Sequence, residues 1–493
     1  MFTPSKPLFR GSGITPAPPL ALHGCAATRT LERQYPDDQT DPPLMQRAGL
    51  AIARLALALA PYSKSVWVAC GPGNNGADGL LAAQHLQQWG KCVVVTGPAS
   101  IAQAASERGL GWSANVPGSC DLAIDALLGI GAVRAIDGRY ADWVVHIEKC
   151  RQLGALVLAV DVPSGLHADK GTAMGPRVTA DHTLSLLTLK PGLFTGEGRD
   201  VCGQIWFNPL DVESVDQPPD AWLSGSPLLH PRQHSSHKGS YGDVAVVGGA
   251  TGMAGAAVLA ATAALHAGAG RVYVSLLGAD AMPAMAPAAL MTRPLPALHL
   301  PDLSVVAGCG AGPQLSGQMA TALPRILAEA RHVVLDADAL NIVSQRPDLQ
   351  ATLARRNPCH TVLTPHPLEA ARLLNCDVAT IQADRFAAAQ ALAARFHACV
   401  VLKGAGSIIS APGYAPRINP TGNARLACAG TGDVLAGTIG ALLAGGQAAP
   451  EAACDACYRH GQIADDWPAH QGTLTADALA HAMAPNAAYP PFS

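Results

Sequence analysis

The sequence predicts an α/β chain in which helices cover parallel sheets, and three observations support this fold class. The chain has 493 residues, of which 49% are hydrophobic and 14% are charged, so it can bury the cores of about two or three domains. Short runs with strand character alternate with helical stretches, an order that favours parallel strands. Glycine-rich segments follow several of these runs, and ligands bind at that end of such sheets.

Composition excludes several classes of protein. The net charge of -3 and the lack of a dense Lys/Arg cluster argue against a nucleic-acid partner. Thirteen cysteines are too few for a disulfide scaffold, and we interpret the lone pair Cys454 and Cys457 as one face of a buried helix. Residues 1–22 are rich in proline and lack an apolar core, so we expect neither a signal peptide nor a membrane anchor. A cytoplasmic, reducing location follows.

In the first half, strands are predicted at residues 66–71, 92–97, 121–127, 155–162, 183–189 and 204–209. Residues 71–79 read GPGNNGADG, a loop of small and polar residues before a helix predicted over residues 80–89. A glycine-rich loop that opens a helix binds anions, because the first N–H groups of the helix lack partners. Asn74, Asn75 and Asp78 add side-chain oxygens and amides, so we expect this loop to hold more than phosphate.

Hard oxygen ligands also follow two neighbouring predicted strands. Asp125 lies near the end of one strand, and Asp161 and Ser164 lie at the end of the next. Helix capping by Asp and Ser is the alternative interpretation, and it explains each residue singly. Together these strand ends favour a cation site, and the small number of carboxylates favours an alkali ion.

The middle of the chain contains a predicted linker and a long run without charges. Residues 211–226 are polar and contain proline without apolar periodicity, which is typical of an interdomain linker. The charge-free run 244–265 is long enough for a membrane span, but its glycines and alanines suit close packing better than lipid. We therefore predict a strand at residues 243–247, a glycine-rich turn and a buried helix that ends near Ala267.

The most informative segment lies near the C-terminus, where Gly430-Thr431-Gly432-Asp433 opens an apolar helix. The free N–H groups of such a helix can hold a phosphoryl group while Asp433 takes a proton from an attacking hydroxyl. A tight turn without function is the alternative for this tetrapeptide. A second glycine-rich bend at residues 404–407 follows a predicted strand at residues 399–403, and the two loops together suggest a nucleotide.

The motifs at residues 71–79, 125–131 (DALLGIG) and 161–165 (DVPSG) resemble, in this order, the N-terminal domain of NAD(P)H-hydrate epimerases. The resemblance covers residues 20–215, includes a helix near residues 43–49, and implies a Rossmann-like domain with K⁺ held by Asn75, Asp125 and Ser164. It implies Asp161 as the acid/base. The implied substrate contacts are Asn74, Asn75, Gly76, Ala77, Asp78, Gly129, Ile130, Gly131, Ala132, Val133, Arg134, Ala135 and Asp161.

Ala77 departs from that family, which usually has glycine there. If this position needed a positive φ, the methyl group would crowd the ligand. We expect such crowding to lower affinity and to leave activity intact.

The second half, residues 228–485, is similar to ADP-dependent NAD(P)H-hydrate dehydratases, which have a ribokinase-like α/β fold. The matching motifs lie at residues 237–242, 252–256, 335–341, 363–367, 403–407 and 419–423, with strands that begin near residues 243, 271, 303, 332, 361 and 399. The resemblance implies Asp433 as the catalytic residue and Mg²⁺ bound with ADP. It implies substrate contacts at Ala256, Gly312, His366 and Asp433, and nucleotide contacts at Lys403, Gly404, Ala405, Gly406, Ser407 and Gly432.

Some of these positions have plainer interpretations, and some motifs depart from the family. His366 can be a packed loop residue, Lys403 can extend its amine from a strand to water, and Asp336 with Asp338 can cap a helix that begins near Ala339. The departures are the loop at residues 309–313, Leu368 in place of a glycine, and Ala429 in place of another glycine. None of them removes a chemically active side chain.

The resemblance implies a bifunctional enzyme that repairs NADHX and NADPHX, with an epimerase domain at residues 1–215, a linker at 216–227 and a dehydratase domain at 228–493. It also implies a homo-oligomer, although no interface patch can be identified from one chain. ADP is the implied donor, but the residues leave ATP open. Two rival functions are a ribokinase-type kinase acting on a vitamin-precursor alcohol, and a nucleotide-sensing or RNA-related binding module, which the lack of a basic patch disfavours.

Overall fold

The computed structural model describes residues 6–7, 18–36, 41–131, 134–173, 175–212, 217–227, 232–278, 282–284 and 286–483. The chain divides into two compact units, whose main segments are Ala21–Ala221 and Trp222–Ser493. The division after Ala221 falls within the predicted linker at residues 216–227. The domain boundaries given above stay a prediction.

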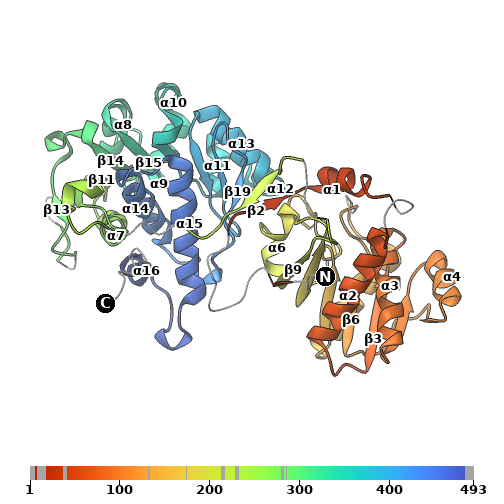
Figure 1. The fold of residues 1–493 in the computed structure, drawn as a ribbon. Coiled ribbons are helices and arrows are strands. Elements are labelled where there is room, and N and C mark those ends of the chain that lie inside the picture. The colour runs from red at the N-terminus through yellow and green to blue at the C-terminus, as the bar shows by residue number, and fades with distance from the viewer. Residues whose placement is uncertain are drawn as a thin grey trace. The chain divides into compact units, whose positions relative to one another are not determined.

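The first unit is a twisted sheet with helices on both faces (Figure 1). Its order is β1 (Lys6–Pro7), β9 (Gln204–Asn208), β8 (His182–Leu186), β7 (Leu156–Val160), β6 (Leu122–Ala126), β3 (Ser65–Cys70), β4 (Cys92–Thr96) and β5 (Gly111–Trp112). Neighbouring strands are parallel except for β1, which is antiparallel to β9. The helices are α1 (Cys25–Glu32), α2 (Leu44–Leu59), α3 (Asn74–Gln88), α4 (Ala99–Glu107), α5 (Gly138–Gln152) and α6 (Gly198–Val201).

Alternation along β3 explains why helices cover both faces of this sheet. Val66 and Val68 pack into a core with residues of α2 and α3. Trp67 and Ala69 point the other way, into a core that includes residues of α5. A strand buried on both faces is apolar throughout, which is the pattern that the sequence shows.

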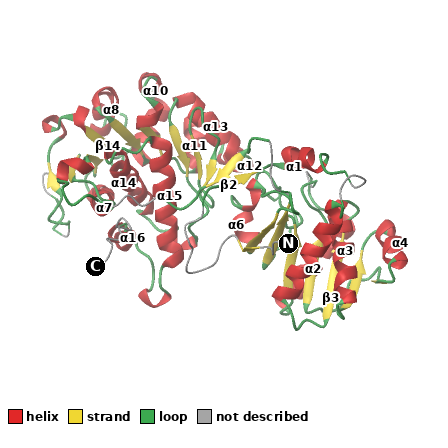
Figure 2. Ribbon diagram, in the orientation of Figure 1, coloured by secondary structure: helices red, strands yellow, loops and turns green. Residues whose placement is uncertain are grey.

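The second unit is also a mainly parallel sheet between helices, as Figure 2 shows by its yellow strands and red helices. Its strands follow the order β13 (Met291–Thr292), β12 (Arg271–Leu276), β11 (Asp243–Gly248), β14 (Leu303–Ala307), β15 (His332–Leu335), β16 (Thr361–Leu363), β17 (Cys399–Leu402), β18 (Ile408–Ser410), β19 (Arg417–Ile418) and β10 (Ala221–Leu223). β18 is antiparallel to both of its neighbours. A further short strand, β2, spans Leu20–Leu22.

Helices cover each face of this second sheet. The core on one face includes residues of α8 (Gln318–Glu329), α9 (Ala337–Gln345), α10 (Pro347–Ala354), α11 (Pro367–Leu374), α12 (Val378–Ala383) and α13 (Arg385–Phe396). The core on the other face includes residues of α7 (Ala254–His266), α14 (Thr431–Ala444) and α15 (Ala449–Asp466). The last helix, α16 (Ala476–Ala482), packs with α7 and α14 in a smaller cluster.

The predicted strands and the helix near residues 43–49 are confirmed, but the helix predicted over residues 80–89 is wrong at its start. α3 begins at Asn74, so most of the predicted loop is helical. The glycines there serve close packing, because a Cβ at Gly76 would collide with the Gly71 carbonyl and one at Gly79 with the Ala126 side chain.

The middle of the chain also differs in part from its prediction. The predicted linker contains strand β10, which pairs in parallel with β19. The charge-free run is strand β11, a turn and the 13-residue helix α7, as predicted. Among the described residues, none of the helices is both long and apolar enough to cross a membrane.

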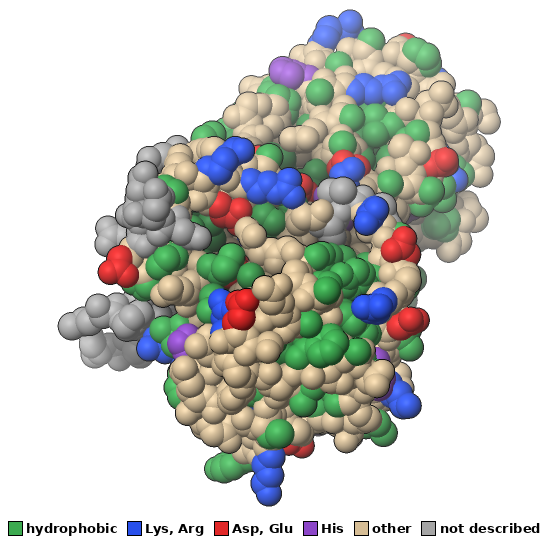
Figure 3. Space-filling model, turned by 90° about the vertical axis from the view of Figure 1, so that its right-hand side faces the viewer, with side chains coloured by type: hydrophobic (Ala, Val, Ile, Leu, Met, Phe, Trp, Pro, Cys, Tyr) green, Lys and Arg blue, Asp and Glu red, His purple; other side chains and the backbone are tan. Residues whose placement is uncertain are grey.

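Two further sequence predictions concern surfaces and cysteines. Cys454 and Cys457 are buried on α15 with free thiols, which confirms their interpretation as a helix face. On the face drawn in Figure 3, Lys and Arg side chains are spread among acidic and hydrophobic ones. The cytoplasmic location stays a prediction.

Two candidate active sites

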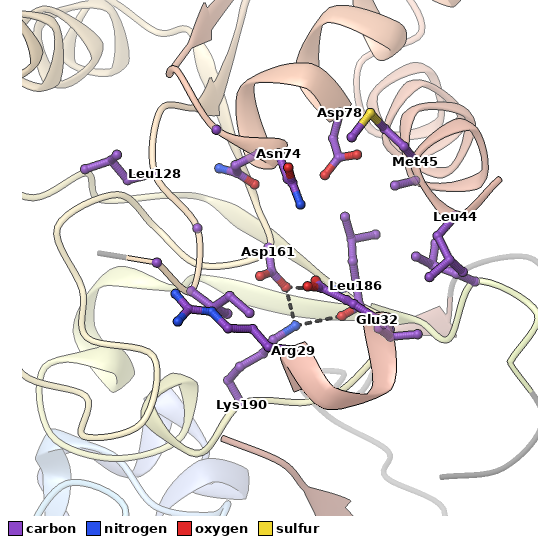
Figure 4. A pocket seen from close by; sticks show the side chains of 18 of the residues that line it. Arg29, Glu32, Leu44, Met45, Asn74, Asp78, Leu128, Asp161, Leu186 and Lys190 are labelled. Atoms are coloured by element: carbon purple, nitrogen blue, oxygen red, sulfur yellow. Dashed lines mark hydrogen bonds and ion pairs between the residues drawn. The ribbon is translucent and has the colours of Figure 1, made fainter. Parts of the chain in front are cut away.

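The first unit contains a pocket of about 630 Å³ at the carboxyl ends of β3, β6, β7 and β8. The first turns of α3, the loop after β6 and helix α1 form its walls (Figure 4). Its acidic, basic and amide side chains belong to Arg29, Glu32, Asn74, Asn75, Asp78, Asp161 and Lys190. This is the edge of a parallel sheet where ligands are expected.

Asp161 and Lys190 form a buried ion pair in this pocket. The Lys190 side chain is 1% exposed, and its Nζ donates to the Asp161 carboxylate, to Leu186 O at 2.6 Å and to Thr188 O at 2.9 Å. Asp161 also accepts from Leu186 N at 3.2 Å, and its φ of 67° is unusual for a residue other than glycine. These contacts hold the Asp161 carboxylate in one place.

Burial raises the pKa of two other carboxyl groups of the pocket. Burial raises the pKa of Asp78 well above its ordinary value, and the negative charges of Asp161 and Glu32 add to the effect. Burial also raises the pKa of Glu32, but Lys190 and Arg29 oppose that rise. A Cβ built at Gly131 would lie 3.5 Å from Arg29 Nη2, so this guanidinium lies beside the loop after β6.

The predicted cation ligands are partly brought together. Asp125 is fully buried and accepts from Ser164 N at 2.8 Å, Ser164 Oγ at 2.6 Å and Leu127 N at 3.2 Å. Burial raises the pKa of Asp125 to about 6, against the hydrogen bonds from Ser164. Asn75 Nδ2 is buried without a partner, and a Cβ at Gly129 would lie 3.3 Å from Asn75 Oδ1.

Other residues predicted from the epimerase resemblance divide into two groups. Gly129, Ile130 and Gly131 line the pocket. Gly76, Ala77, Arg134 and Ala135 do not line it, whereas Ala132 and Val133 lie outside the described residues. Ala77 is inside α3 and has no positive φ, so the predicted crowding does not arise from the backbone.

Sequence reasoning missed three charged residues of this pocket. Arg29 and Glu32 come from α1, which precedes every motif quoted above. Lys190 directly follows the strand predicted at residues 183–189, just as Asp161 follows its own strand. A charged residue at the end of an apolar strand was therefore a signal that could have found Lys190.

The second candidate site is at the start of α14. Gly430 has a φ of 90°, and a Cβ there would lie 2.7 Å from Leu259 and 2.9 Å from Ala476, so only glycine fits. Asp433 lies in the first turn of the helix. Its carboxylate, the Asp336 carboxylate and Cys309 Sγ come within 4.8 Å of one another.

Lys403 provides the positive charge of this second site. Its Nζ donates to Asp336 Oδ1 at 2.7 Å and lies 4.0 Å from Glu369 Oε2. Thr364 Oγ1 also donates to Asp336 Oδ1, at 2.8 Å. A Cβ at Gly432 would lie 3.3 Å from Lys403 Nζ, so the ammonium lies next to the first turn of α14.

The lysine compensates Asp336 and leaves Asp433 with little compensation. Burial disfavours the ammonium of Lys403, but the carboxylates of Asp336 and Glu369 outweigh burial and raise the Lys403 pKa. Burial raises the pKa of Asp433 to about 7, the charge of Asp336 adds to the rise, and Cys309 and Lys403 oppose it. Burial raises the pKa of Glu369 to about 7 as well. Asp433 can therefore exchange protons near neutral pH.

The plainer interpretations from sequence are partly wrong. The Lys403 side chain is mostly buried, at 19% exposed, and its ammonium pairs with Asp336 instead of extending into water. Asp336 precedes α9 without a capping bond from its side chain, whereas Asp338 accepts from Gly312 N at 2.8 Å. His366 caps α11, because its Nδ1 accepts from Leu368 N and Glu369 N.

The remaining residues predicted for this site lie on loops and in the first turn of a helix. Gly312, with a φ of 83°, is fixed by Asp338, and Ala256 lies in the first turn of α7. Gly404 and Gly406 have φ values of 143° and 60°, so the bend at residues 404–407 needs glycine at both positions. The buried guanidinium of Arg385 supports this bend by donating to Leu402 O at 3.3 Å and Lys403 O at 3.4 Å.

The fold and these two sites define an enzyme with two α/β units, each with reactive carboxylates at the ligand-binding edge of its sheet. Comparison with known families agrees with that class. The family model described as NAD(P)H-hydrate dehydratase matches residues 244–485, and the model described as YjeF-related protein N-terminus matches residues 42–192.

Two relatives match across both units. The bifunctional NAD(P)H-hydrate repair enzyme Nnr of Escherichia coli (strain K12) is 38% identical over 463 residues, which cover 87% of this chain and 86% of the relative. The enzyme of the same description from Vibrio cholerae is 36% identical over 467 residues, 89% of this chain and 92% of the relative. The chain therefore belongs to the family of bifunctional NAD(P)H-hydrate repair enzymes, and the resemblance stated from its motifs is confirmed.

Among solved structures, the chain is similar to the ADP/ATP-dependent NAD(P)H-hydrate dehydratase from Bacillus subtilis co-crystallised with ATP and Mg²⁺. The identity is 30%, the TM-score is 0.44, and the match covers 52% of this chain and 92% of that structure.

Proposed function

We propose that the chain repairs hydrated NADH and NADPH through two linked reactions. The first unit interconverts the R and S epimers of the hydrate. The second unit dehydrates the S epimer to NAD(P)H at the expense of ADP, giving AMP and phosphate. The observation that carries the proposal is the Asp433 carboxyl, which lies at the start of α14 with its pKa raised to about 7.

The substrate has a hydroxyl at C6 of the nicotinamide ring, where water has added across a double bond. Asp433 takes the proton of this hydroxyl as its oxygen attacks the terminal phosphoryl group of ADP. The first N–H groups of α14 and the Lys403 ammonium lie where they neutralise the charge of that group. The phosphorylated carbinolamine then expels phosphate, driven by the adjacent ring nitrogen, and the loss of a proton from C5 forms the C5–C6 double bond of NAD(P)H.

Mg²⁺ would enter this site with the phosphates of ADP, whose charge it neutralises. The nearest oxygen donors are the Asp433 and Asp336 carboxylates, which suit a hard cation. The third member of that cluster, the Cys309 thiol, does not suit Mg²⁺. ADP as the phosphoryl donor is a proposal that rests on the family resemblance.

A phosphoryl-transfer site of this kind accepts one configuration at C6, because the other places the hydroxyl away from Asp433 and the donor. The wrong epimer would therefore accumulate without a second activity. The pocket of the first unit supplies that activity, with Asp161 moving protons while the ring nitrogen assists exchange at C6. Arg29, beside Gly131, is placed to meet a phosphate group of the dinucleotide.

The first unit would hold K⁺ beside Asp125, with Ser164 Oγ and Asn75 Oδ1 as further ligands. The donor set fits, because Asp125 is fully buried and forms no ion pair with another residue that the structure describes. Leu127 N donates to Asp125 and Leu128 N to Ser164 Oγ, so a cation there would fix the loop that lines the pocket. A homo-oligomer and a cytoplasmic location remain predictions from the sequence.

Product analysis tests the proposal against a ribokinase-type kinase. The full chain is incubated with both hydrate epimers, Mg²⁺ and either ADP or ATP, and absorbance, nucleotide and phosphate are followed. The proposal predicts that the dihydronicotinamide absorbance returns with one phosphate per reduced cofactor, and that ADP supports the reaction. A stable phosphorylated product without returning absorbance would contradict it and favour the kinase.

A further inference from the structure

Asp78 is a carboxyl group of the pocket that neither the ion pair nor the cation site uses. It lies on α3 and points into the same cavity as Asp161, which comes from the end of β7 (Figure 4). Among the described residues, no hydrogen bond or ion pair joins its carboxyl to another side chain or to the backbone. A carboxyl inside a pocket with no protein partner is available to the substrate.

We propose that Asp78 is a second catalytic residue of the epimerisation, acting as general acid while Asp161 acts as general base. The proposal rests on the proposed function of the first unit, and adds the group that lets the C6 hydroxyl leave. The pocket then holds one carboxyl that gives a proton and one carboxylate that takes a proton.

The step balances with these two groups alone. The C6–O bond breaks as the Asp78 carboxyl gives its proton to the hydroxyl, which leaves as water, while the lone pair of the ring nitrogen forms a C=N bond. Water then adds to C6 from the opposite face, and its proton goes to the Asp161 carboxylate. The product is the other epimer, and proton exchange with water returns Asp78 to its acid form and Asp161 to its carboxylate before the next turnover.

The charges around the pocket favour this division of roles. Lys190 bonds directly to Asp161, whereas no Lys or Arg among the described residues forms an ion pair with Asp78. The charged groups that face Asp78 are the carboxylates of Asp161 and Glu32, and both raise its pKa in addition to burial. Glu32 is a weaker candidate for the acid, because Lys190 and Arg29 partly compensate its charge.

The pH dependence follows from these roles. Asp78 must be protonated to act, so the rate falls as pH rises through its raised pKa. A purely structural Asp78 would leave the high-pH fall unchanged when it is replaced.

The experiment measures epimerisation by the full chain. ADP is left out, so that dehydration does not take place. Asp78→Asn keeps the shape of the side chain, and we expect kcat to fall roughly 10²-fold with KM within about threefold, and the high-pH fall to disappear. Asp78→Glu should keep the high-pH fall. Gln88→Ala, at the exposed end of the same helix, is the control, and its kcat, KM and pH dependence should equal those of the unchanged chain.

Isotope labelling adds a readout that does not depend on a variant. In water enriched in ¹⁸O, each epimerisation by the unchanged chain should place the label at C6. Retention of the original oxygen would overturn the role of Asp78, because the hydroxyl would never have left.

Two other results would overturn the proposal. One is Asp78→Asn with unchanged kcat and the high-pH fall intact, and the other is an identical loss in Asp78→Asn and Asp78→Glu. Failure of the proposed function looks different: the unchanged chain would not epimerise at all, or Asp161→Asn would epimerise at the full rate.

Discussion

The two units place a buried lysine beside their reactive carboxylates in different ways. In the first unit, Lys190 bonds directly to Asp161. In the second unit, Lys403 bonds to Asp336, and Asp433 keeps a pKa raised to about 7. A buried lysine can thus pair with the reacting carboxylate itself, or it can compensate a neighbour and leave the reacting carboxyl ready to exchange a proton near neutral pH.

This difference matches the chemistry proposed for each unit. A carboxylate that accepts a proton from water at C6 benefits from a fixed position, and the bond from Lys190 fixes Asp161. A carboxylate that activates an alcohol for phosphoryl transfer benefits from higher basicity, which burial gives to Asp433. The predictions below test this contrast.

The largest effect is expected from Asp433→Asn. It removes the base of the second unit, so dehydration should fall by roughly 10²-fold or more while ADP affinity is kept. Single-turnover dehydration and nucleotide titration measure the two quantities. Asp466→Asn, at an exposed position of α15, is the control. Unchanged turnover in Asp433→Asn would remove this residue from the mechanism.

Asp161→Asn should affect only the other unit. Epimerisation should slow roughly 10²-fold, because the proton acceptor is lost, while dehydration of the pure S epimer continues at its normal rate. Separate assays on the R and S epimers measure this. If both activities disappeared together, the variant would have lost its fold and the contrast would not hold.

Removing each lysine sharpens the comparison. Lys190→Met and Lys403→Met each leave a buried carboxylate without its partner, and we expect the free energy of unfolding to drop by about 3–5 kcal/mol at pH 8. Denaturant titration of each variant measures this.

Lys403→Met should also move the pH dependence of dehydration upward, because Lys403 opposes the raised pKa of Asp433. An unshifted profile would show that Lys403 does not act on Asp433.

The pH dependence of dehydration should follow Asp433. The base must be deprotonated, and its pKa is raised to about 7, so below that pH the rate should fall about tenfold per pH unit and above it should level off. Initial rates between pH 5 and pH 9 with saturating substrates measure this. A rate that is flat from pH 5 upward would mean that Asp433 is already ionised at low pH.

The smallest effect concerns K⁺. A cation beside Asp125 binds only the folded first unit, so K⁺ at tenfold its Kd should stabilise that unit by about 1.4 kcal/mol. Thermal unfolding in K⁺ compared with a bulky organic cation measures the shift. Asp125→Asn should abolish the K⁺ dependence, and a dependence that survives would place the ion elsewhere.

Much of the fold could be predicted from sequence, because strands buried on both faces leave continuous apolar runs such as those at residues 66–71 and 243–247. The start of α3 could not be predicted from sequence. Gly76 and Gly79 are typical of a loop, but in the structure they lie in the helix and allow close packing. Strand β10 was missed because its three residues form a strand through pairing with segments distant in sequence, such as β19.

The candidate sites were predicted unevenly for a related reason. Asp433 and Asp161 stand in local patterns that mark strand or helix ends, and the sequence displays them. The pairing of the buried lysines cannot be seen in local patterns, because Lys190 is 29 residues from Asp161 and Lys403 is 67 residues from Asp336. Which carboxylate each lysine compensates is a property of tertiary packing.

The most direct test of the two-site account is the final amount of reduced cofactor formed from a known mixture of R and S epimers with ADP and Mg²⁺. The unchanged chain should convert the whole mixture, Asp161→Asn should stop at the fraction supplied as the S epimer, and Asp433→Asn should form almost none. Complete and equally fast conversion by Asp161→Asn, or conversion by Asp433→Asn at the normal rate, would contradict the account.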